Sequence, residues 1–170
     1  KNAKIPSFIE VIESFAFCGC KMLSTVKFSN DSKLQIINSK AFSCSSIMEF
    51  ACPLHLTKIC NDAFSDCKNL RFFDIPNDSK LQIIEEGAFI DSSIACFSFP
   101  QYAVQIEKYA FASCKNLQII EINENSQIKK ILQNSFTGSE QVIIMIPVNL
   151  DIKFIASSKK PITRKINLFE

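Results

Sequence analysis

Apolar residues recur along this chain at fixed distances from a small-Phe pair. The six pairs are Ala16-Phe17, Ala41-Phe42, Ala63-Phe64, Ala88-Phe89, Ala110-Phe111 and Ser135-Phe136. Successive pairs are 25 and 22 residues apart in alternation, so the larger unit is 47 residues long. Every pair has an isoleucine four residues before it and an apolar residue seven residues before it. A fixed period of this length is typical of a repeat architecture.

This pattern predicts a β-rich solenoid. A unit of 22–25 residues cannot bury its own apolar face, whereas stacked units align their Leu, Ile and Phe side chains in continuous rows. Each coil opens with an alternating run, rich in β-branched and aromatic residues, that predicts a strand. These runs are 23–28, 47–52, 70–75, 94–99, 117–122 and about 142–146. A shorter extended piece follows, and we expect the small-Phe segment to form a single helical turn with its Phe in the core.

The repeat pattern also predicts the domain organisation. Residues 1–150 are expected to form one solenoid of about six coils. Ile5-Pro6 matches the end of a short repeat such as Cys52-Pro53, so the array is expected to open in mid-repeat. Ser157-Ser158 stands where the next small-Phe pair would fall. We therefore expect residues 151–170 to be a degenerate C-terminal cap or an exit segment, since terminal repeats that face water are atypical.

The eight cysteines favour free thiols over a disulfide framework. Cys20, Cys67 and Cys114 hold the same position in alternate coils. Alternate coils are about 10 Å apart, which exceeds the limit of roughly 7 Å between the Cα atoms of bridged cysteines. We expect these three residues to be small buried fillers. A bridge between Cys44 and either Cys18 or Cys67 stays open as an alternative.

Composition argues against several classes of function. The net charge is only +2 and acidic residues interleave the lysines, so neither nucleic acid nor an anionic membrane is expected as a partner. No apolar run approaches the ~20 residues of a membrane helix, so this segment is not expected to insert into a membrane. His55, the only histidine, falls in a variable turn, and zinc-type spacing and a glycine-rich phosphate loop are lacking. We therefore expect no catalysis, no metal and no cofactor.

The recurring residues follow Leu-x-x-Ile-x-x-x-Ala-Phe-x-x-Cys-x-x-Leu-x-x-Ile-x-Ile-Pro. The pattern is nearly complete at Leu56, Ile59, Ala63, Phe64, Cys67, Leu70, Phe73, Ile75 and Pro76. Over residues 5–150 it resembles the BspA-type leucine-rich repeat family, also called the Treponema pallidum class. The family's usual Gly, two residues after the Ile, is replaced here by Ser14, Ser39, Asn61, Glu86, Lys108 and Gln133.

This resemblance implies a fold, a location and a function. The fold would be a leucine-rich repeat right-handed superhelix. Members of the family are typically surface or secreted proteins of oral bacteria and mucosal protist parasites, implicated in adhesion to host matrix proteins or to other cells. The resemblance therefore implies a protein partner, whereas the spacing by itself predicts only the solenoid.

Three residues of each first strand should point away from the core and form rows across the sheet. The first row is Ser24, Met48, Arg71, Ala95, Gln118 and Val142, the middle row is Thr25, Glu49, Phe72, Cys96, Ile119 and Ile143, and the third is Lys27, Ala51, Asp74, Ser98, Glu121 and Met145. The middle row becomes apolar from Phe72 onward, which predicts a protein-binding surface with a polar rim. Its residues would be Arg71, Phe72, Asp74, Cys96, Gln118, Ile119, Glu121, Ile143 and Met145. There are two alternatives to a binding surface. The exposed apolar residues are scattered ones that a solenoid sheet tolerates, or this face packs against another copy of the chain.

Asn30-Asp31-Ser32 and Asn77-Asp78-Ser79 match the N-glycosylation pattern, which makes Asn30 and Asn77 candidate acceptors. Two functions remain open. The chain is expected to be a cell-surface or secreted adhesion and recognition module, or else an intracellular interaction scaffold, which the eight reduced cysteines would favour.

Overall fold

The computed structural model describes residues 1–132, 134–139, 141–154 and 162–166. Within these ranges the chain forms short strands and no helix. The strands are β1 (Asn2–Lys4), β2 (Val11–Ile12), β3 (Thr25–Lys27), β4 (Ile36–Ile37), β5 (Glu49–Ala51), β6 (Lys58–Ile59), β7 (Phe72–Asp74), β8 (Ile83–Ile84), β9 (Cys96–Phe99), β10 (Gln105–Ile106), β11 (Ile119–Ile122), β12 (Lys130–Ile131), β13 (Ile143–Pro147), β14 (Lys153–Phe154) and β15 (Ile162–Ile166).

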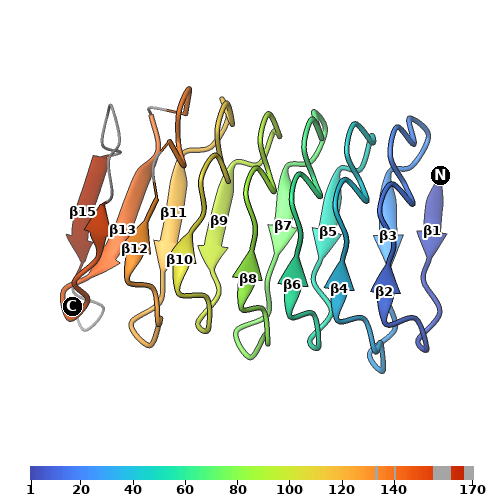
Figure 1. Cartoon of the computed structure of the whole chain (residues 1–170), viewed down its shortest axis with the longest axis horizontal. Coiled ribbons are helices and arrows are strands. Elements are labelled where there is room, and N and C mark those ends of the chain that lie inside the picture. The colour runs from blue at the N-terminus through green and yellow to red at the C-terminus, as the bar shows by residue number, and fades with distance from the viewer. Residues whose placement is uncertain (133, 140, 155–161, 167–170) are drawn as a thin grey trace.

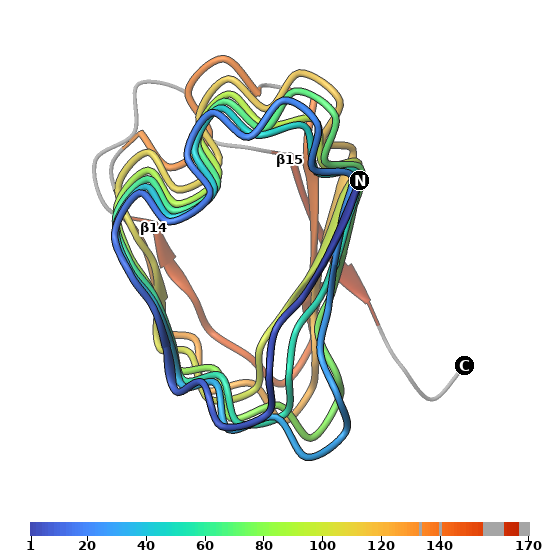
Figure 2. The ribbon, with the colours of Figure 1, turned by 90° about the vertical axis from the view of Figure 1, so that its right-hand side faces the viewer.

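The chain winds into a parallel β-solenoid of about seven turns (Figure 1). The odd-numbered strands lie on one side of the solenoid, in two four-stranded sheets (β1-β3-β5-β7 and β9-β11-β13-β15), and the even-numbered strands lie on the other, in a four-stranded sheet (β2-β4-β6-β8) and a three-stranded one (β10-β12-β14). We call the odd-numbered side the long sheet and the even-numbered side the short sheet. In the long sheet β7 meets β9 through a hydrogen bond of 3.4 Å from the Ala95 amide to the Arg71 carbonyl. Viewed along the axis, the two sheets form opposite sides of the cross-section, and turns and loops close its two ends (Figure 2).

The phenylalanines of the small-Phe pairs form one continuous column inside the solenoid. Successive rings are nearly parallel, at interplanar angles of 5–9°. Their centroids lie 5.0–5.7 Å apart along Phe17, Phe42, Phe64, Phe89, Phe111 and Phe136. Phe50, Phe73 and Phe97 from the long sheet pack edge-on against this column. The predicted stacking of coils is therefore confirmed.

The single helical turn predicted for each small-Phe segment is wrong. The Ala41 amide donates to Asn38 three residues earlier in its own coil, at 3.2 Å. The next amide, that of Phe42, instead donates to the Ala63 carbonyl of the following coil, at 2.8 Å. The same alternation recurs along the segment and in the other coils. Because every second amide bonds to the next coil, the segment forms linked tight turns instead of a helix.

Two residues of each small-Phe segment adopt a left-handed backbone, with φ between 54° and 76°. They directly precede the small residue (Phe15, Lys40, Asp62, Gly87, Tyr109, Asn134) or follow it by three positions (Gly19, Cys44, Asp66, Asp91, Ser113, Gly138). The first of these positions lies three residues after the isoleucine of each repeat. The family's Gly was expected two residues after that isoleucine. Gly87 occupies it in the fourth coil. Gln133, at the originally assigned position, lies outside the described residues.

The cysteine and serine positions of successive coils form a polar column that is buried from Ser45 to Ser139, whereas Cys20, also expected to be buried, is half-buried. The thiols of Cys67 and Cys114 donate to the carbonyls of Phe42 and Phe89, at 3.1 and 3.0 Å. Ser139 makes the same contact to the Phe111 carbonyl at 2.8 Å. All eight cysteines are free, so the bridge from Cys44 that was left open is not formed.

The described part of the C-terminal region continues both sheets. β14 pairs with β12, and β15 pairs with β13. The division at residue 150 and the cap assigned to 151–170 stay predictions, and Ser157-Ser158 lies outside the described residues.

Candidate functional site

The candidate partner-binding residues come from the outer face of the long sheet. Along each strand one side chain points into the core and the next points outward, as the exposed, buried, exposed pattern of β7 shows. The strand register sets Glu49 beside Phe72, and Ile119 beside both Cys96 and Ile143. The middle row deduced from the sequence is therefore aligned in the structure from Thr25 to Phe72 and from Cys96 to Ile143.

Phe72 on β7 is the exposed large hydrophobic residue of this row. The Phe72 side chain is 64% exposed, which is high for a large apolar residue. Cys96 on β9 is also exposed, whereas Ile119 and Ile143 are half-buried. Met145, on the third row, is half-buried as well. Phe72 thus offers the largest apolar contact area on the face.

The placement of Val142 in the outward-facing first row is wrong, because its side chain is fully buried. Its amide donates to the Ser139 carbonyl of the same coil at 3.3 Å, as the Leu70 amide does to Cys67 at 3.1 Å. Val142 therefore fills the buried position that leucine holds in the long coils. The polar residue before it, Gln141, is exposed.

Charged and polar side chains border the apolar row on both sides. Arg71 and Gln118 are exposed on one side, and Asp74 and Glu121 on the other. The Ser98 hydroxyl donates to Glu121 at 3.4 Å. Ion pairs in the described part of the chain involve other residues, namely Lys40–Asp62, Lys58–Glu85 and Lys68 with Asp66 and Asp91. The charges on this face are therefore available to a partner.

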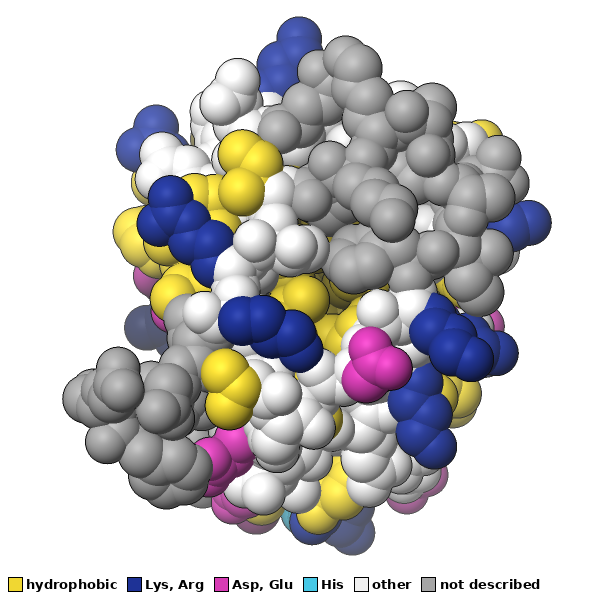
Figure 3. Space-filling model, turned by 90° about the vertical axis from the view of Figure 1, so that its left-hand side faces the viewer, with side chains coloured by type: hydrophobic (Ala, Val, Ile, Leu, Met, Phe, Trp, Pro, Cys, Tyr) yellow, Lys and Arg dark blue, Asp and Glu magenta, His cyan; other side chains and the backbone are white. Residues whose placement is uncertain are grey.

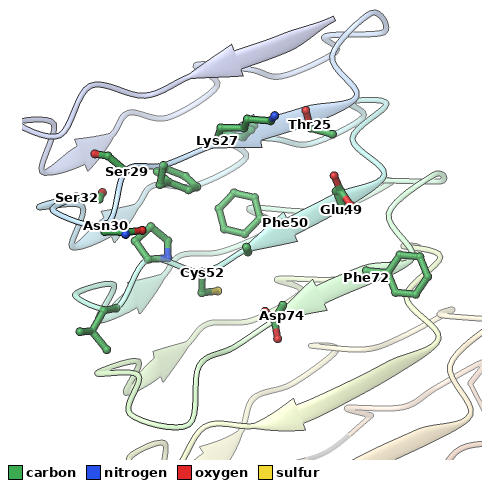
Figure 4. A pocket seen from close by; sticks show the side chains of 15 residues that line it. Thr25, Lys27, Ser29, Asn30, Ser32, Glu49, Phe50, Cys52, Phe72 and Asp74 are labelled. Carbon is green, nitrogen blue, oxygen red and sulfur yellow. The ribbon is translucent and has the colours of Figure 1, made fainter.

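A first groove of about 600 Å³ lies where β3, β5 and β7 meet the loop after β3 (Figure 4). Figure 4 shows Phe72 and Asp74 projecting from opposite ends of β7, with Asn30 on the loop beyond β3. Lys27 projects from β3 and Glu49 from β5. The buried Thr25 hydroxyl of this groove has no hydrogen-bond partner.

A second groove, of about 460 Å³, lies two coils further along, between the loops after β7 and β11. It is lined by Asn77, Ser98, Pro100 and the predicted residues Glu121 and Met145. A third hollow at the other strand ends brings together Arg71, Gln118, Ile119 and Ile143. The structure thus distributes the predicted residues over three hollows on one face, and only Cys96 lies outside all three.

Sequence reasoning missed the loop residues that form one wall of the two grooves. The sequence marked Pro53 and Pro100 only as residues that end strands, and Asn30 and Asn77 only as turn residues and candidate glycosylation acceptors. The alternation of coil lengths could have indicated the grooves. Only the long coils carry extra residues, such as 30–33 and 77–80, and these make the loops after their first strands longer than those of the short coils.

Comparison with known families decides what the repeat is. A model of the BspA type Leucine rich repeat region matches in six copies over residues 1–103 and 82–158. This chain belongs to the BspA-type leucine-rich repeat family. A search of curated proteins gave no match.

Solved structures share the fold of this BspA-type chain. A crystal structure of the pneumococcal vaccine antigen PcpA matches with a TM-score of 0.57 and 18% identity over 91% of this chain and 57% of that one. A leucine-rich repeat protein from Bacteroides ovatus ATCC 8483 matches with a TM-score of 0.50 and 18% identity over 92% of this chain and 51% of that one. The chain therefore spans little more than half the length of these structures.

The serines of both glycosylation patterns have structural roles in this BspA-type solenoid. Ser32 and Ser79 are buried, and their hydroxyls accept from the amides of Leu34 and Leu81 at 3.4 and 3.2 Å. The Ser126 hydroxyl likewise accepts from the Ile128 amide at 3.3 Å, although Ser126 is not part of an N-glycosylation pattern. The turn thus explains each serine without a glycan, while Asn30 and Asn77 are exposed and stay candidate acceptors.

The thiols of the core are unreactive near neutral pH. Burial raises the pKa of Cys67 to about 12 and that of Cys114 to about 11, so neither forms a nucleophilic thiolate near neutral pH. His55 is exposed on its turn. Over the described ranges, no cluster of three or more His, Cys, Asp and Glu residues is placed to hold a metal ion.

Charge and hydropathy complete the description of the surface. At the C-terminal end, Lys and Arg side chains are spread around the molecule with acidic and apolar ones among them (Figure 3). In the part of the chain that the structure describes, there is no helix long and apolar enough to cross a membrane.

Proposed function

We propose that this BspA-type segment is a non-catalytic protein-binding module of a surface or secreted protein, used for adhesion to, or recognition of, host or neighbouring-cell proteins. Its contact surface is the outer face of the long sheet. The observation that carries the proposal is the row from Phe72 through Cys96 and Ile119 to Ile143. Charged side chains flank it on both sides and form no ion pair among the described residues. The likeness to a vaccine antigen fits an exposed location of the protein.

The physical case rests on Phe72. Binding energy at protein interfaces concentrates in a few buried aromatic and Arg side chains surrounded by a polar rim. Phe72 is exposed in the free protein, so a partner that covers it gains the transfer free energy of a large apolar side chain, about 1.5–3 kcal/mol. The sheet is held by hydrogen bonds between coils, so little ordering accompanies binding.

The experiment compares two charge-introducing variants. Phe72→Asp combined with Ile119→Asp places carboxylates in the middle of the proposed face. Ile83→Asp is the matched control, because Ile83 is 46% exposed on β8 of the short sheet. Each protein is immobilised and exposed to an extract of host-cell surface and matrix proteins, and the retained proteins are identified by mass spectrometry.

We expect a protein that is retained by the wild type and by Ile83→Asp to be lost by the double variant. Circular dichroism should be the same for all three proteins. Equal retention by the folded double variant would reject this face as the binding surface. If the retained protein is lost only on Ile83→Asp, the binding surface lies on the short sheet instead.

An intracellular interaction scaffold is the second candidate, favoured by the eight free cysteines. Treatment of the native protein with an N-glycosidase separates the two. A gain in electrophoretic mobility would establish glycans and exclude the intracellular scaffold. Unchanged mobility, together with recovery from the cytosolic fraction of source cells, would favour it.

A further inference from the structure

The two grooves on the long sheet are copies of one site, related by the 47-residue period. Eight lining positions of the first groove have their equivalents in the second. These pairs are Phe28 and Ile75, Ser29 and Pro76, Asn30 and Asn77, Ala51 and Ser98, Cys52 and Phe99, Pro53 and Pro100, Leu54 and Gln101, and Asp74 and Glu121. The surface therefore has a repeating unit of two coils.

The alternation of coil lengths creates this unit. In the long coils the loops after β3 and β7 project beyond the sheet, as the blue and green loops at the lower end of Figure 2 show. In the short coils the chain instead turns at Pro53 or Pro100, both of which are buried. Each groove is a recess over a short coil beside a projecting long-coil loop. Since stacked strands are about 4.8 Å apart, the two recesses repeat every ~9.6 Å.

Charge follows the same alternation. On the third row the long coils carry the exposed carboxylates Asp74 and Glu121, and the short coils between and before them carry Ala51 and Ser98. Neither carboxylate belongs to an ion pair within the described ranges. The equivalent residues on β3 and β15 are Lys27 and Arg164, so within the described residues the acidic positions of this row are Asp74 on β7 and Glu121 on β11. The edge thus presents two carboxylates, Asp74 and Glu121, that lie two coils apart.

We infer that this edge binds a peptide in polyproline II conformation that carries a basic side chain at every third position. Such a helix has three residues per turn and rises about 3.1 Å per residue, so the same side recurs every ~9.3 Å. A β-strand repeats its face about every 6.7 Å, and an α-helix turns every ~5.4 Å, so neither matches the two-coil spacing. The inference rests on the proposed function and names the class of partner.

Each part of the repeat has a role in this complex. A proline ring of the ligand packs into each recess, against Pro53 and Leu54 in the first groove. The basic side chain pairs with Asp74 or Glu121 on the neighbouring long coil. A polyproline II backbone has no internal hydrogen bonds, so its carbonyls accept from the side-chain amides of loop residues such as Asn77. A glycan at Asn30 or Asn77 would stand at the mouth of a groove, so glycosylation and peptide binding exclude each other there.

The test uses fluorescein-labelled peptides and the whole chain. (Pro-Pro-Lys)4 presents lysine in the required period, and (Gly-Gly-Lys)4 has the same charge without the stiff helix. A third peptide, Pro8Lys4, has the same composition as the first with its lysines in one block. Fluorescence anisotropy measures the dissociation constant of each for the wild type, for Asp74→Asn combined with Glu121→Gln, and for the control Glu86→Gln, which removes an exposed carboxylate away from the grooves.

We expect (Pro-Pro-Lys)4 to bind at least fivefold more tightly than either other peptide. Exposed ion pairs are each worth roughly two- to fivefold in affinity, so the double variant should lose about tenfold and Glu86→Gln less than twofold. Equal binding of all three peptides would mean general electrostatic attraction and would overturn the inference. No binding, or binding unchanged in the double variant, would overturn it as well.

The failure of this inference is distinguishable from failure of the proposed function. If Phe72→Asp with Ile119→Asp abolishes partner capture while no peptide binds, the face binds a partner of another class and only the polyproline inference falls. If partner capture survives that variant, the proposed face itself is wrong. A protein that dimerises in sedimentation and is dissociated by Asp74→Asn with Glu121→Gln would show a second copy on this edge, which also overturns the inference.

Discussion

Phe64 lies at the centre of the phenylalanine column, so its replacement measures what the stacking of coils contributes to stability. The side chain is fully buried, between Phe42 at 5.2 Å and Phe89 at 5.4 Å, with Phe50 and Phe73 edge-on at 5.0 and 5.1 Å. Truncation of a buried Phe to Ala costs about 3–5 kcal/mol. With a denaturant dependence of about 2 kcal/mol per molar urea, Phe64→Ala should lower the unfolding midpoint by about 1.5–2.5 M.

Phe17→Ala is the matched control. Phe17 has the same place in the first coil but is half-buried and stacks on Phe42 alone, at 5.0 Å. We expect it to cost less than half as much as Phe64→Ala. Urea unfolding followed by circular dichroism measures both variants, with Phe64→Leu as a smaller truncation that should cost less than Phe64→Ala. Equal costs at Phe64 and Phe17, or a cost below about 1 kcal/mol at Phe64, would refute the column as a main source of stability.

Three further predictions test local features. Gly87→Ala should destabilise the chain by about 1–3 kcal/mol, because φ is +65° and the new Cβ meets the Asp62 carboxylate, and the cost should fall when Asp62→Ala is added. In the native protein Cys18, which is exposed, should react with a thiol reagent at pH 8, whereas Cys67 should react only on unfolding; fast labelling of Cys67 would contradict its burial. Burial raises the Cys67 pKa from 9.0 to about 12, so the unfolded chain releases this proton first and stability should fall as the pH rises through that window. Cys67→Ser should make that fall shallower, and an unchanged slope in urea midpoints between pH 8 and 10 would count against the linkage.

The sequence predicted the solenoid, its two coil lengths and the outward rows because these follow from side-chain periodicity alone. Thr25, Glu49 and Phe72 align as a row since the strand register is set by which residues must be buried. The same reasoning identified the Phe column, because only a core position repeats an aromatic residue in each coil.

Other features depend on hydrogen bonds that periodicity does not encode. A small-Phe segment with three- and four-residue spacing is compatible with a helical turn, but the bond from Phe42 to Ala63 in the next coil excludes one. Val142 was assigned outward by strand register, although the spacing Ser139-x-x-Val142 equals that of Cys67-x-x-Leu70 and could have shown the buried position. The grooves depend on how far the loops project, which no spacing rule supplies.

The outer face of the long sheet is the surface that we propose partners cover. Hydroxyl-radical footprinting with mass spectrometry tests it on the wild-type chain, with and without a saturating captured partner. We expect reduced oxidation of Phe72 and Met145 on this face, with Ile83 on the short sheet and Tyr109 on the turns unchanged. Protection of Ile83 or Tyr109 while Phe72 stays fully reactive would contradict it.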